Sequence, residues 1–354
     1  MNEPIAKRAQ LCRITLQRGD KSFEVRRNDL LLRSALAQGV AYPHNCRVGT
    51  CGRCKTRLVR GHITPLVDFA LSPLTNQELK EGYILACQAQ VRSDLCIDVE
   101  LGHHAIHPQR TIASRVVGWR RLEGDVLDLR LRLEEPLMFS AGQYASLAPA
   151  GSFVRRSFSF YDAPPAADGA GADEVGFLIK RLPGGRLSEW LFAEDRRGYK
   201  IWLEGPFGQM GVDDEDRDGL CVAGGTGIAP ILSIVSDRLQ RTSQATFTIV
   251  FGVRGAADLF ATDRLRALQD RAPGRVRVLP ILSQEPAGSS WQGRRGMVTE
   301  ALTPELCSDY RQVSAFVCGG TPMVEAVERR LVSLGVAATR IHTDKFQPTG
   351  IEAG

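Results

Sequence analysis

The spacing of four cysteines constrains this chain more than any other feature of its sequence. Three of them form the pattern C-x4-C-x2-C and the fourth follows after 32 further residues, at positions Cys46, Cys51, Cys54 and Cys87. Four thiolates with this spacing are the plant-type ligands of a [2Fe-2S] cluster. A structural zinc site also takes four thiolates, but Cys87 has no second cysteine two residues away, as the paired knuckles of zinc sites require. The spacing therefore favours an iron-sulfur cluster over zinc.

The loop between the first three cysteines is rich in small residues, namely Gly49, Thr50 and Gly52. Glycine adopts positive φ without strain and lets the backbone come close to a cluster. The apolar run 83–86 leads directly into Cys87 and is typical of a strand that delivers the last thiolate. We expect a loop that wraps the cluster and a strand that closes the site.

The other cysteines do not suggest disulfides. The total of nine is odd, and residues 1–16 carry charges where a signal peptide needs an apolar run. The longest apolar stretch, 219–235, is broken by four glycines and a proline. We expect a cytoplasmic protein with reduced thiols and no membrane span.

Length and charge narrow the function further. A chain of 354 residues is expected to hold two or three domains. The surplus of five positive charges falls within residues 1–102, which contain 15 Lys and Arg against 10 Asp and Glu. This surplus is too small and diffuse for a nucleic-acid footprint, and no nucleic-acid-binding motif accompanies it. A solvated basic face or a docking surface for an acidic protein both remain open.

A linker is expected after residue 102, where the strand pattern breaks at 102–109. It contains His103, His104 and His107, but no Cys, Asp or Glu accompanies them at ligand spacing. We therefore interpret these histidines as part of a polar connection in preference to a metal site.

Short period-two runs such as 126–133, with frequent Gly and Pro turns, predict an antiparallel β-barrel over 112–212. One of its strands contains Arg156, Ser157, Phe158 and Ser159. Alternation places Arg156 and Phe158 on one face and the two serines on the other. Alone, this run fits an ordinary amphipathic barrel strand equally well.

A second element in the same region strengthens a nucleotide interpretation. The segment 180–191 is predicted to be a strand, a Pro-Gly-Gly turn and the start of a helix. Backbone amides at the beginning of a helix suit a pyrophosphate group. The candidate contacts are Gly185, Arg186, Leu187 and Ser188.

Beyond residue 213 strands alternate with helices, which predicts a parallel α/β sheet. The buried strand 220–223 leads into the turn 224–230, a variant of the glycine-rich dinucleotide motif, G-x-G-x-x-P. Further strands are expected at 246–253, 276–282 and 315–318, with a helix at 323–334. The candidate dinucleotide contacts are Gly225, Thr226, Gly227 and Pro230.

The sequence gives weaker evidence for a preference between NADH and NADPH than for a dinucleotide site. No acidic residue stands at the end of the second strand, 251–254, where one commonly holds the ribose hydroxyls. Asp258 is able to take that role, whereas Arg254 is able to accept a 2′-phosphate.

Residues 1–102, and above all 43–54, resemble the ferredoxin domain of NADH-dependent electron-transfer reductases of bacterial oxygenase systems. The rest of the chain resembles the ferredoxin-NADP reductase superfamily through the motifs R-x-[YF]-S at 156–159, G-x-x-S at 185–188, and C-G-P-x-x-M at 318–323, where Gly320 replaces the proline. The resemblance implies a multidomain chain with a β-grasp ferredoxin (α+β), an antiparallel β-barrel flavin domain and a Rossmann-like α/β nicotinamide domain. The implied boundaries are 1–102 for the ferredoxin, 103–111 for the linker, 112–212 for the FAD-binding barrel and 213–354 for the NAD-binding domain.

The resemblance also implies roles for single residues. Arg156 would pair with a flavin phosphate, Phe158 would lie against the isoalloxazine, and Ser159 would hydrogen-bond near its N5 atom. Family members usually have Tyr at position 158, so one hydroxyl contact is missing. The same analogy places Cys318 and Gly319 beside the nicotinamide. Residues 343–346 resemble the family's E-K-F ending, with Asp344 in place of the usual Glu, and Phe346 would cover the flavin until nicotinamide displaces it.

The motif order implies a path from NADH, in preference to NADPH, through FAD to the cluster. The domain order favours FAD over FMN by resemblance, and Ser159 and Cys318 would flank the hydride transfer. The expected acceptor is a terminal oxygenase or hydroxylase protein, docked by the basic residues Arg47, Arg53, Lys55 and Arg57. Two alternatives stay open: a non-oxygenase acceptor such as an iron-sulfur dehydratase, and a cofactor-binding module that does not turn over.

Overall fold

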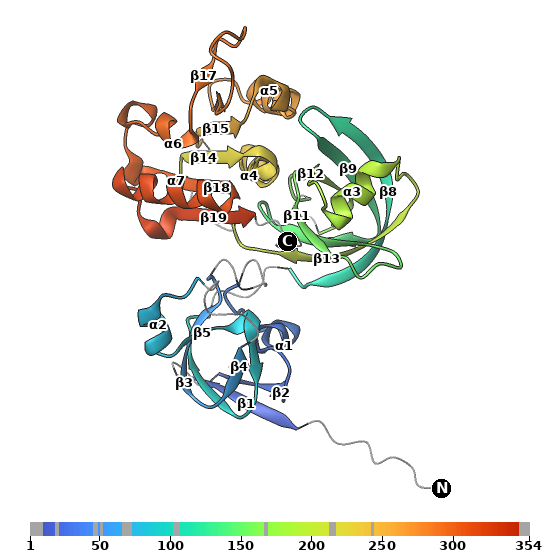
Figure 1. Cartoon of the computed structure of the whole chain (residues 1–354), viewed down its shortest axis with the longest axis vertical. Coiled ribbons are helices and arrows are strands. Elements are labelled where there is room, and N and C mark those ends of the chain that lie inside the picture. The colour runs from blue at the N-terminus through green and yellow to red at the C-terminus, as the bar shows by residue number, and fades with distance from the viewer. Residues whose placement is uncertain are drawn as a thin grey trace. The chain divides into compact units, whose positions relative to one another are not determined.

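A computed structural model of the chain describes residues 10–17, 21–44, 49, 52–65, 73–101, 107–165, 169–211, 217–241 and 244–346. The chain forms two compact units, Met1–Pro108 and Gln109–Gly354 (Figure 1). In the part of the chain that the structure describes, no helix is long and apolar enough to cross a membrane. The boundaries among the three expected domains stay predictions.

The first unit is built on a five-stranded sheet with the order β2-β1-β7-β3-β5. Its elements are β1 (Leu11–Leu16), β2 (Ser22–Arg26), α1 (Leu31–Ala37), β3 (Lys55–Arg60), β4 (Ile63–Pro65), α2 (Asn76–Lys80), β5 (Tyr83–Leu85), β6 (Ala89–Val91) and β7 (Leu95–Asp98). Alternate residues of β1 and β2 are buried, so one face of this hairpin lies on the core. Helix α1 ends before Gly39, whose φ of 73° closes the turn that follows the helix.

The first lobe of the second unit is a six-stranded antiparallel sheet with the order β11-β10-β13-β8-β9-β12. Its elements are β8 (Arg110–Leu122), β9 (Val126–Leu137), β10 (Tyr144–Pro149), β11 (Arg156–Ser159), β12 (Ala172–Lys180), α3 (Arg186–Ala193) and β13 (Lys200–Phe207). A bridge between Phe160, just after β11, and Phe177 of β12 joins the two ends of the sheet. The rings of these two residues lie 5.3 Å apart in the core. The sheet therefore curls into a closed barrel.

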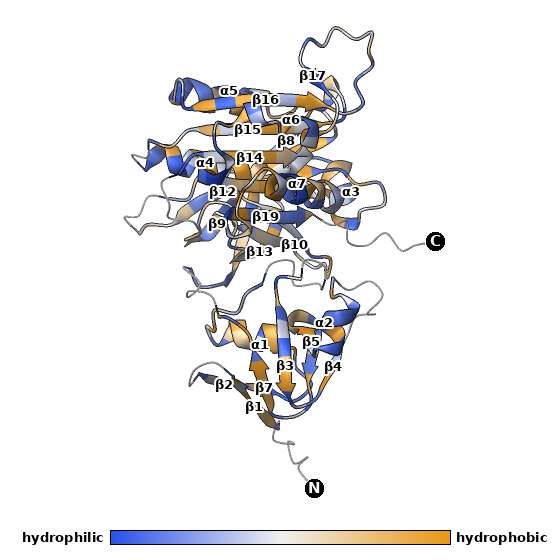
Figure 2. Cartoon of the chain, turned by 90° about the vertical axis from the view of Figure 1, so that its left-hand side faces the viewer, coloured by the Kyte–Doolittle hydropathy of each residue, from blue (hydrophilic) through white to orange (hydrophobic). Residues whose placement is uncertain are grey.

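The second lobe is a parallel sheet with the order β17-β16-β15-β14-β18-β19. Its elements are β14 (Gly219–Gly224), α4 (Ile228–Gln240), β15 (Phe247–Val253), α5 (Thr262–Arg271), β16 (Val276–Leu282), β17 (Arg294–Arg295), α6 (Val298–Ala301), β18 (Ser314–Gly320), α7 (Thr321–Ser333) and β19 (Ile341–Phe346). Figure 2 shows hydrophobic residues along the central strand β14, which is buried almost throughout. The chain runs outward from β14 to β17 and then returns to β18 on the other side of β14. This reversal is a topological switch point, where α/β sheets bind ligands at the carboxyl ends of their strands.

The two lobes of the second unit share one hydrophobic core. Val126, Tyr161 and Leu178 of the barrel lobe belong to the same buried cluster as Ile231 of α4 and Phe251 of β15. The lobes are therefore packed as one body, and we call this contact between them the seam. Groups from both lobes can be held at fixed separation there.

Candidate functional site

The first unit brings two of the four predicted cluster ligands to neighbouring positions. Cys54 lies just before β3 and Cys87 just after β5, and these two strands pair with Lys55 opposite Leu85. The Ala86 amide donates a hydrogen bond to the Cys54 carbonyl over 3.2 Å. The two cysteines are 4% and 3% exposed, as the ligands of a shielded cluster should be.

The other two predicted ligands, Cys46 and Cys51, lie outside the described residues, as do Arg47, Thr50 and the linker histidines His103 and His104. Among the residues that are described, no group of three or more His, Cys, Asp or Glu side chains gathers for a metal. The glycines of the loop fit its expected course, because Gly49 and Gly52 have φ values of 90° and 69°. The prediction that this loop uses positive φ is confirmed at both positions.

Residues from both lobes of the second unit meet at the end of β11. Ser159, which is 4% exposed, donates a hydrogen bond from its hydroxyl to Asp344 Oδ2 over 3.4 Å. Asp344 lies on β19, directly opposite Cys318 of the neighbouring strand β18. Two motifs that are 185 residues apart in sequence therefore form one buried polar contact.

The chemistry of Cys318 follows from its surroundings. Burial, and secondarily the nearby Asp344 carboxylate, raise the pKa of the Cys318 thiol well above its ordinary value. The thiol therefore stays protonated at neutral pH and is neither a base nor an activated nucleophile. The Cys318 side chain is fully buried in the structure.

The remaining predicted residues of β11 and β19 lie around this contact. Arg156 and Phe158 are half-buried, whereas Ser157 is exposed. Phe158 packs on the core of the barrel. Phe346 is half-buried at the end of β19, opposite Gly320 of β18.

The turn before α3 is shaped by its own serine. The Ser188 hydroxyl accepts a hydrogen bond from the Leu182 amide at 3.1 Å and lies 3.2 Å from the Gly185 carbonyl, to which it can donate. A Cβ atom on Gly185 would stand 2.5 Å from that hydroxyl. Leu187 is buried, and Arg186 is exposed at the first position of the helix. The turn can present backbone amides to a flavin pyrophosphate.

The turn before α4 is shaped by a neighbouring strand. A Cβ atom on Gly227 would stand 2.3 Å from the Cys318 carbonyl oxygen. Gly225 has a φ of 54°, and a Cβ atom there would meet nothing within 4 Å. Thr226 is half-buried, while Pro230 is buried in the first turn of α4, where its missing N–H costs no hydrogen bond. The open side of this turn leaves room for a dinucleotide phosphate to approach the backbone.

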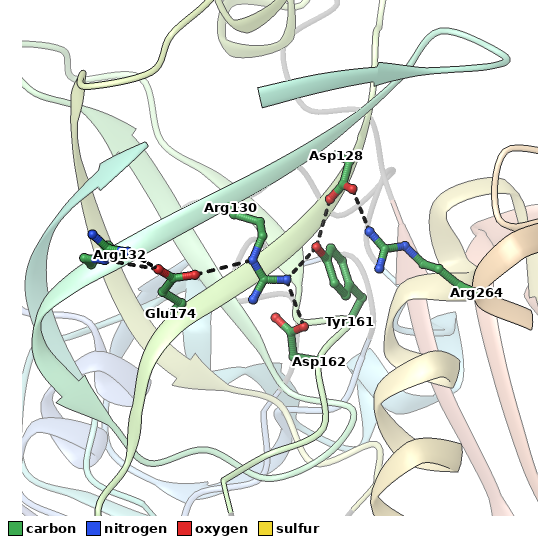
Figure 3. Close-up of polar contacts among 7 residues, drawn as sticks. All are labelled: Asp128, Arg130, Arg132, Tyr161, Asp162, Glu174 and Arg264. Carbon is green, nitrogen blue, oxygen red and sulfur yellow. Dashed lines mark hydrogen bonds and ion pairs between the residues drawn. The ribbon is translucent and has the colours of Figure 1, made fainter. Parts of the chain in front are cut away.

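A polar network crosses the seam between the lobes (Figure 3). Asp128 of β9 accepts hydrogen bonds from the Tyr161 hydroxyl at 2.8 Å and from Arg264 of α5 at 2.6 Å. The Arg264 guanidinium lies 4.2 Å from the centre of the Tyr161 ring, and Arg130 donates to the Tyr161 hydroxyl at 3.0 Å. Burial, and then the Asp128 charge, raise the pKa of Tyr161, so its hydroxyl stays a donor. The network ties the barrel to the parallel sheet a short distance along the chain from Ser159.

Comparison with known proteins agrees with this geometry. Residues 14–92 match the 2Fe-2S iron-sulfur cluster binding domain, and residues 221–329 match the oxidoreductase NAD-binding domain. The xylene/toluene monooxygenase electron transfer component XylA of Pseudomonas putida is 38% identical over 326 residues, which cover 92% of this chain and 90% of that protein. The reductase component of a naphthalene 1,2-dioxygenase system from Pseudomonas putida is 33% identical over 91% of this chain and 94% of its own.

Solved structures extend the likeness to the whole fold. The crystal structure of the Amycolatopsis cytochrome P450 reductase GcoB matches with a TM-score of 0.81 and 30% identity, over 96% of this chain and 100% of that one. A ferredoxin reductase in carbazole 1,9a-dioxygenase matches with a TM-score of 0.75 and 27% identity, over 97% and 100% of the two chains. This chain belongs to the family of oxygenase reductase components.

As a member of that family, the chain is an NAD(P)H-dependent electron-transfer oxidoreductase with an iron-sulfur and a nicotinamide domain. The resemblance and the multidomain fold class that the sequence predicts are both confirmed. The roles of the single site residues stay predictions.

Two carboxylates that received no role from the sequence lie at contacts between distant segments of the structure. Asp344 departs from the usual Glu, yet it holds the Ser159 hydroxyl. Glu285 follows β16 by three residues, and its carboxylate accepts a hydrogen bond from the Ala256 amide beyond the end of β15. No local sequence pattern marks Glu285, because only the pairing of β15 with β16 brings it there.

Proposed function

We propose that this chain takes hydride from NADH onto bound FAD and passes electrons singly through a [2Fe-2S] cluster to a terminal oxygenase or hydroxylase protein. The observation that carries the proposal is the buried contact of Ser159 with Asp344, beside Cys318, at the seam between barrel and parallel sheet. A flavin held by the barrel and a nicotinamide held by the sheet would meet at this seam. The printed names of the relatives, which are electron transfer and reductase components of oxygenase systems, support the same acceptor class.

Residues of the barrel suit the flavin. Arg156 would neutralise a flavin phosphate, and the amides before α3 would bind the pyrophosphate. Phe158 would supply an apolar surface for the ring system, and the Ser159 hydroxyl, oriented by Asp344, would stand near the reacting edge. When bound, FAD would accept the two electrons of a hydride and donate them one at a time to the cluster.

Residues of the parallel sheet suit the nicotinamide nucleotide. The open turn at Gly225 would receive its pyrophosphate, and Gly227 lets that turn press against Cys318. Cys318 and Gly319 would then form one wall of the nicotinamide site. Their small size lets a flat ring approach closely, and the protonated thiol adds no charge to the transfer.

Of the four basic residues expected to dock the acceptor, Arg47 lies outside the described residues. Lys55 forms an ion pair with Glu78 at 2.7 Å, so its charge is partly compensated, while Arg53 and Arg57 are exposed. We propose that Arg53 and Arg57 steer an acidic acceptor to the cluster side of the first unit. A cytoplasmic location is part of the proposal, since the chain needs NADH and reduced cysteine ligands.

Anaerobic titration of the purified protein with NADH, followed by visible absorption and EPR spectroscopy, tests the path. We expect flavin bleaching and then the signal of a reduced [2Fe-2S] cluster. Cys87→Ser should retain flavin bleaching and lose the EPR signal, whereas Cys96→Ser, at a half-buried position of β7, should keep both. Flavin reduction without any EPR signal in the unaltered protein would contradict the proposed path.

A further inference from the structure

The end of β15 is the place where dinucleotide-binding sheets usually hold the adenosine ribose. Strand β15 pairs in parallel with β14, and Gly252 stands opposite Gly224, the residue that begins the glycine-rich turn. A carboxylate after the second strand commonly binds the ribose hydroxyls of NAD. Here β15 ends at Val253, and the next residue is the exposed Arg254.

Asp258 is the first acidic residue after β15 in the sequence, but its carboxylate has other partners. Its carboxylate accepts a hydrogen bond from the Gly255 amide at 3.2 Å and lies 3.9 Å from the Lys180 ammonium of the barrel. A Cβ atom on Gly124 of the barrel would stand 2.7 Å from Asp258 Oδ1. Asp258 therefore caps a short turn and faces the other lobe.

Glu285 supplies a carboxylate at this strand end from a different segment. After β16, the Ser283 and Gln284 amides continue the pairing by donating to the carbonyls of Val253 and Arg254, at 3.0 and 2.8 Å. Glu285 Oε2 then accepts the Ala256 amide at 2.8 Å. A Cβ atom on Gly255 would come within 3.2 Å of the same oxygen. The carboxylate is thus fixed over the backbone that follows β15.

The environment of Glu285 keeps it charged. The Ala256 amide, then Ser289 and more weakly Arg295, lower the pKa of the Glu285 carboxyl group. Arg295 itself is directed to the Pro286 carbonyl and the Ser289 hydroxyl. The side chain of Glu285 is half-buried, so part of it stays open to solvent and to a ligand.

We propose that Glu285 is the residue that selects NADH over NADPH, by accepting the ribose 2′-hydroxyl and repelling a 2′-phosphate. This assignment rests on the nicotinamide function proposed above. A carboxylate gains a charge-assisted hydrogen bond from a ribose hydroxyl, but it meets a like charge when that hydroxyl is phosphorylated. The repulsion from Glu285 would outweigh any attraction of the 2′-phosphate to Arg254, because the backbone holds Glu285 in place.

The test compares Glu285→Gln with Asp270→Asn, which removes the same charge from an exposed position on α5 of the same lobe. The measured quantities are kcat and KM for dye reduction with NADH and with NADPH, together with inhibition constants of 5′-AMP and 2′,5′-ADP. We expect Glu285→Gln to raise the ratio of kcat/KM for NADPH to that for NADH by about tenfold or more, mainly through KM. It should also strengthen inhibition by 2′,5′-ADP relative to 5′-AMP. Asp270→Asn should leave both ratios within about twofold of the unaltered protein.

The added variant Glu285→Gln/Arg254→Gln should lose most of the gain for NADPH, because Arg254 is the cation that remains at the strand end. The assignment is overturned if Glu285→Gln and Asp270→Asn change the two ratios equally, or if the unaltered protein uses NADPH as well as NADH. Failure of the proposed function has a different result, since the unaltered protein would then reduce no dye with either nucleotide.

Discussion

Two helix starts in the second unit offer backbone amides to phosphate, and they are built in different ways. The turn before α3 is held from within, because Ser188 of the helix bonds back to Leu182 and lies against Gly185. The turn before α4 is held from outside, because Gly227 presses on the carbonyl of Cys318 in a strand that comes 91 residues later in the chain. A local contact survives changes elsewhere in the fold, whereas the second turn depends on the docking of β18 beside β14. Substitutions should therefore destabilise the turn before α4, which we call the nicotinamide turn, more easily than the turn before α3.

Gly227→Ala should have the largest effect on stability and on NADH binding. At the binding sites it should alter the nicotinamide turn alone. The new methyl group would stand 2.3 Å from the Cys318 carbonyl oxygen and 2.9 Å from the Gly319 nitrogen, and both of these are backbone atoms. We expect a loss of about 1–3 kcal/mol in the free energy of unfolding from overpacking, and a marked rise in KM for NADH. Urea denaturation and dye reduction measure the two effects, and the content of bound FAD should be retained.

Gly288→Ala is the matched control for this change, because a Cβ atom there meets nothing within 4 Å. It should leave stability and KM unchanged. If Gly227→Ala behaves like Gly288→Ala, the external support of the α4 turn is wrong.

The α3 turn should respond to substitutions at Gly185 and Ser188 as a coupled pair. A methyl group on Gly185 would stand 2.5 Å from the Ser188 hydroxyl and 2.9 Å from the Leu182 carbonyl. Ser188→Ala removes the hydroxyl that accepts the Leu182 amide and should cost about 0.5–1.5 kcal/mol in the free energy of unfolding. The double variant should be more stable than the sum of the single effects implies, by about 0.5 kcal/mol or more, because one of the two close contacts is gone.

Chemical denaturation of the two single variants and the double variant measures the coupling, and the flavin content of the purified proteins reports on the site. All three variants should retain less FAD, and KM for NADH should be unchanged. Strict additivity of the three free energies would show that the serine does not shape the turn.

The same division between local and distant contacts explains what the sequence could predict. Strand β16 was predicted at its observed limits, and the predicted helix 323–334 lies within two residues of α7 at both ends. Periodicity and turn residues carry such information locally. The pairs Ser159–Asp344 and Ala256–Glu285 could not be predicted, because they depend on how the lobes pack and how β15 pairs with β16. The spacing of the cysteines predicted the iron-sulfur domain because the ligand loop is encoded in a short segment.

A substitution in the polar network between the lobes should have the smallest effect. It tests hydride transfer between the two sites without changing the binding of either cofactor. Arg264 on α5 pairs with Asp128 of the barrel, whose side chain is 8% exposed and also meets Arg120 at 3.0 Å. Arg264→Gln should cost about 1 kcal/mol or less in the free energy of unfolding, since Arg120 still pairs with the Asp128 carboxylate and Tyr161 still donates a hydrogen bond to it. FAD content and the dissociation constant for NADH should not change, because neither turn is touched. The rate of flavin reduction in stopped-flow experiments should fall by about threefold to tenfold, because small changes in the distance between donor and acceptor slow a transfer that requires close alignment.

Arg266→Gln, an exposed change on the same helix, is the control and should leave that rate unchanged. Equal rates for the two variants would mean that the shared hydrophobic core alone fixes the lobes, and that the ionic contact between α5 and β9 adds nothing to the alignment of the two sites.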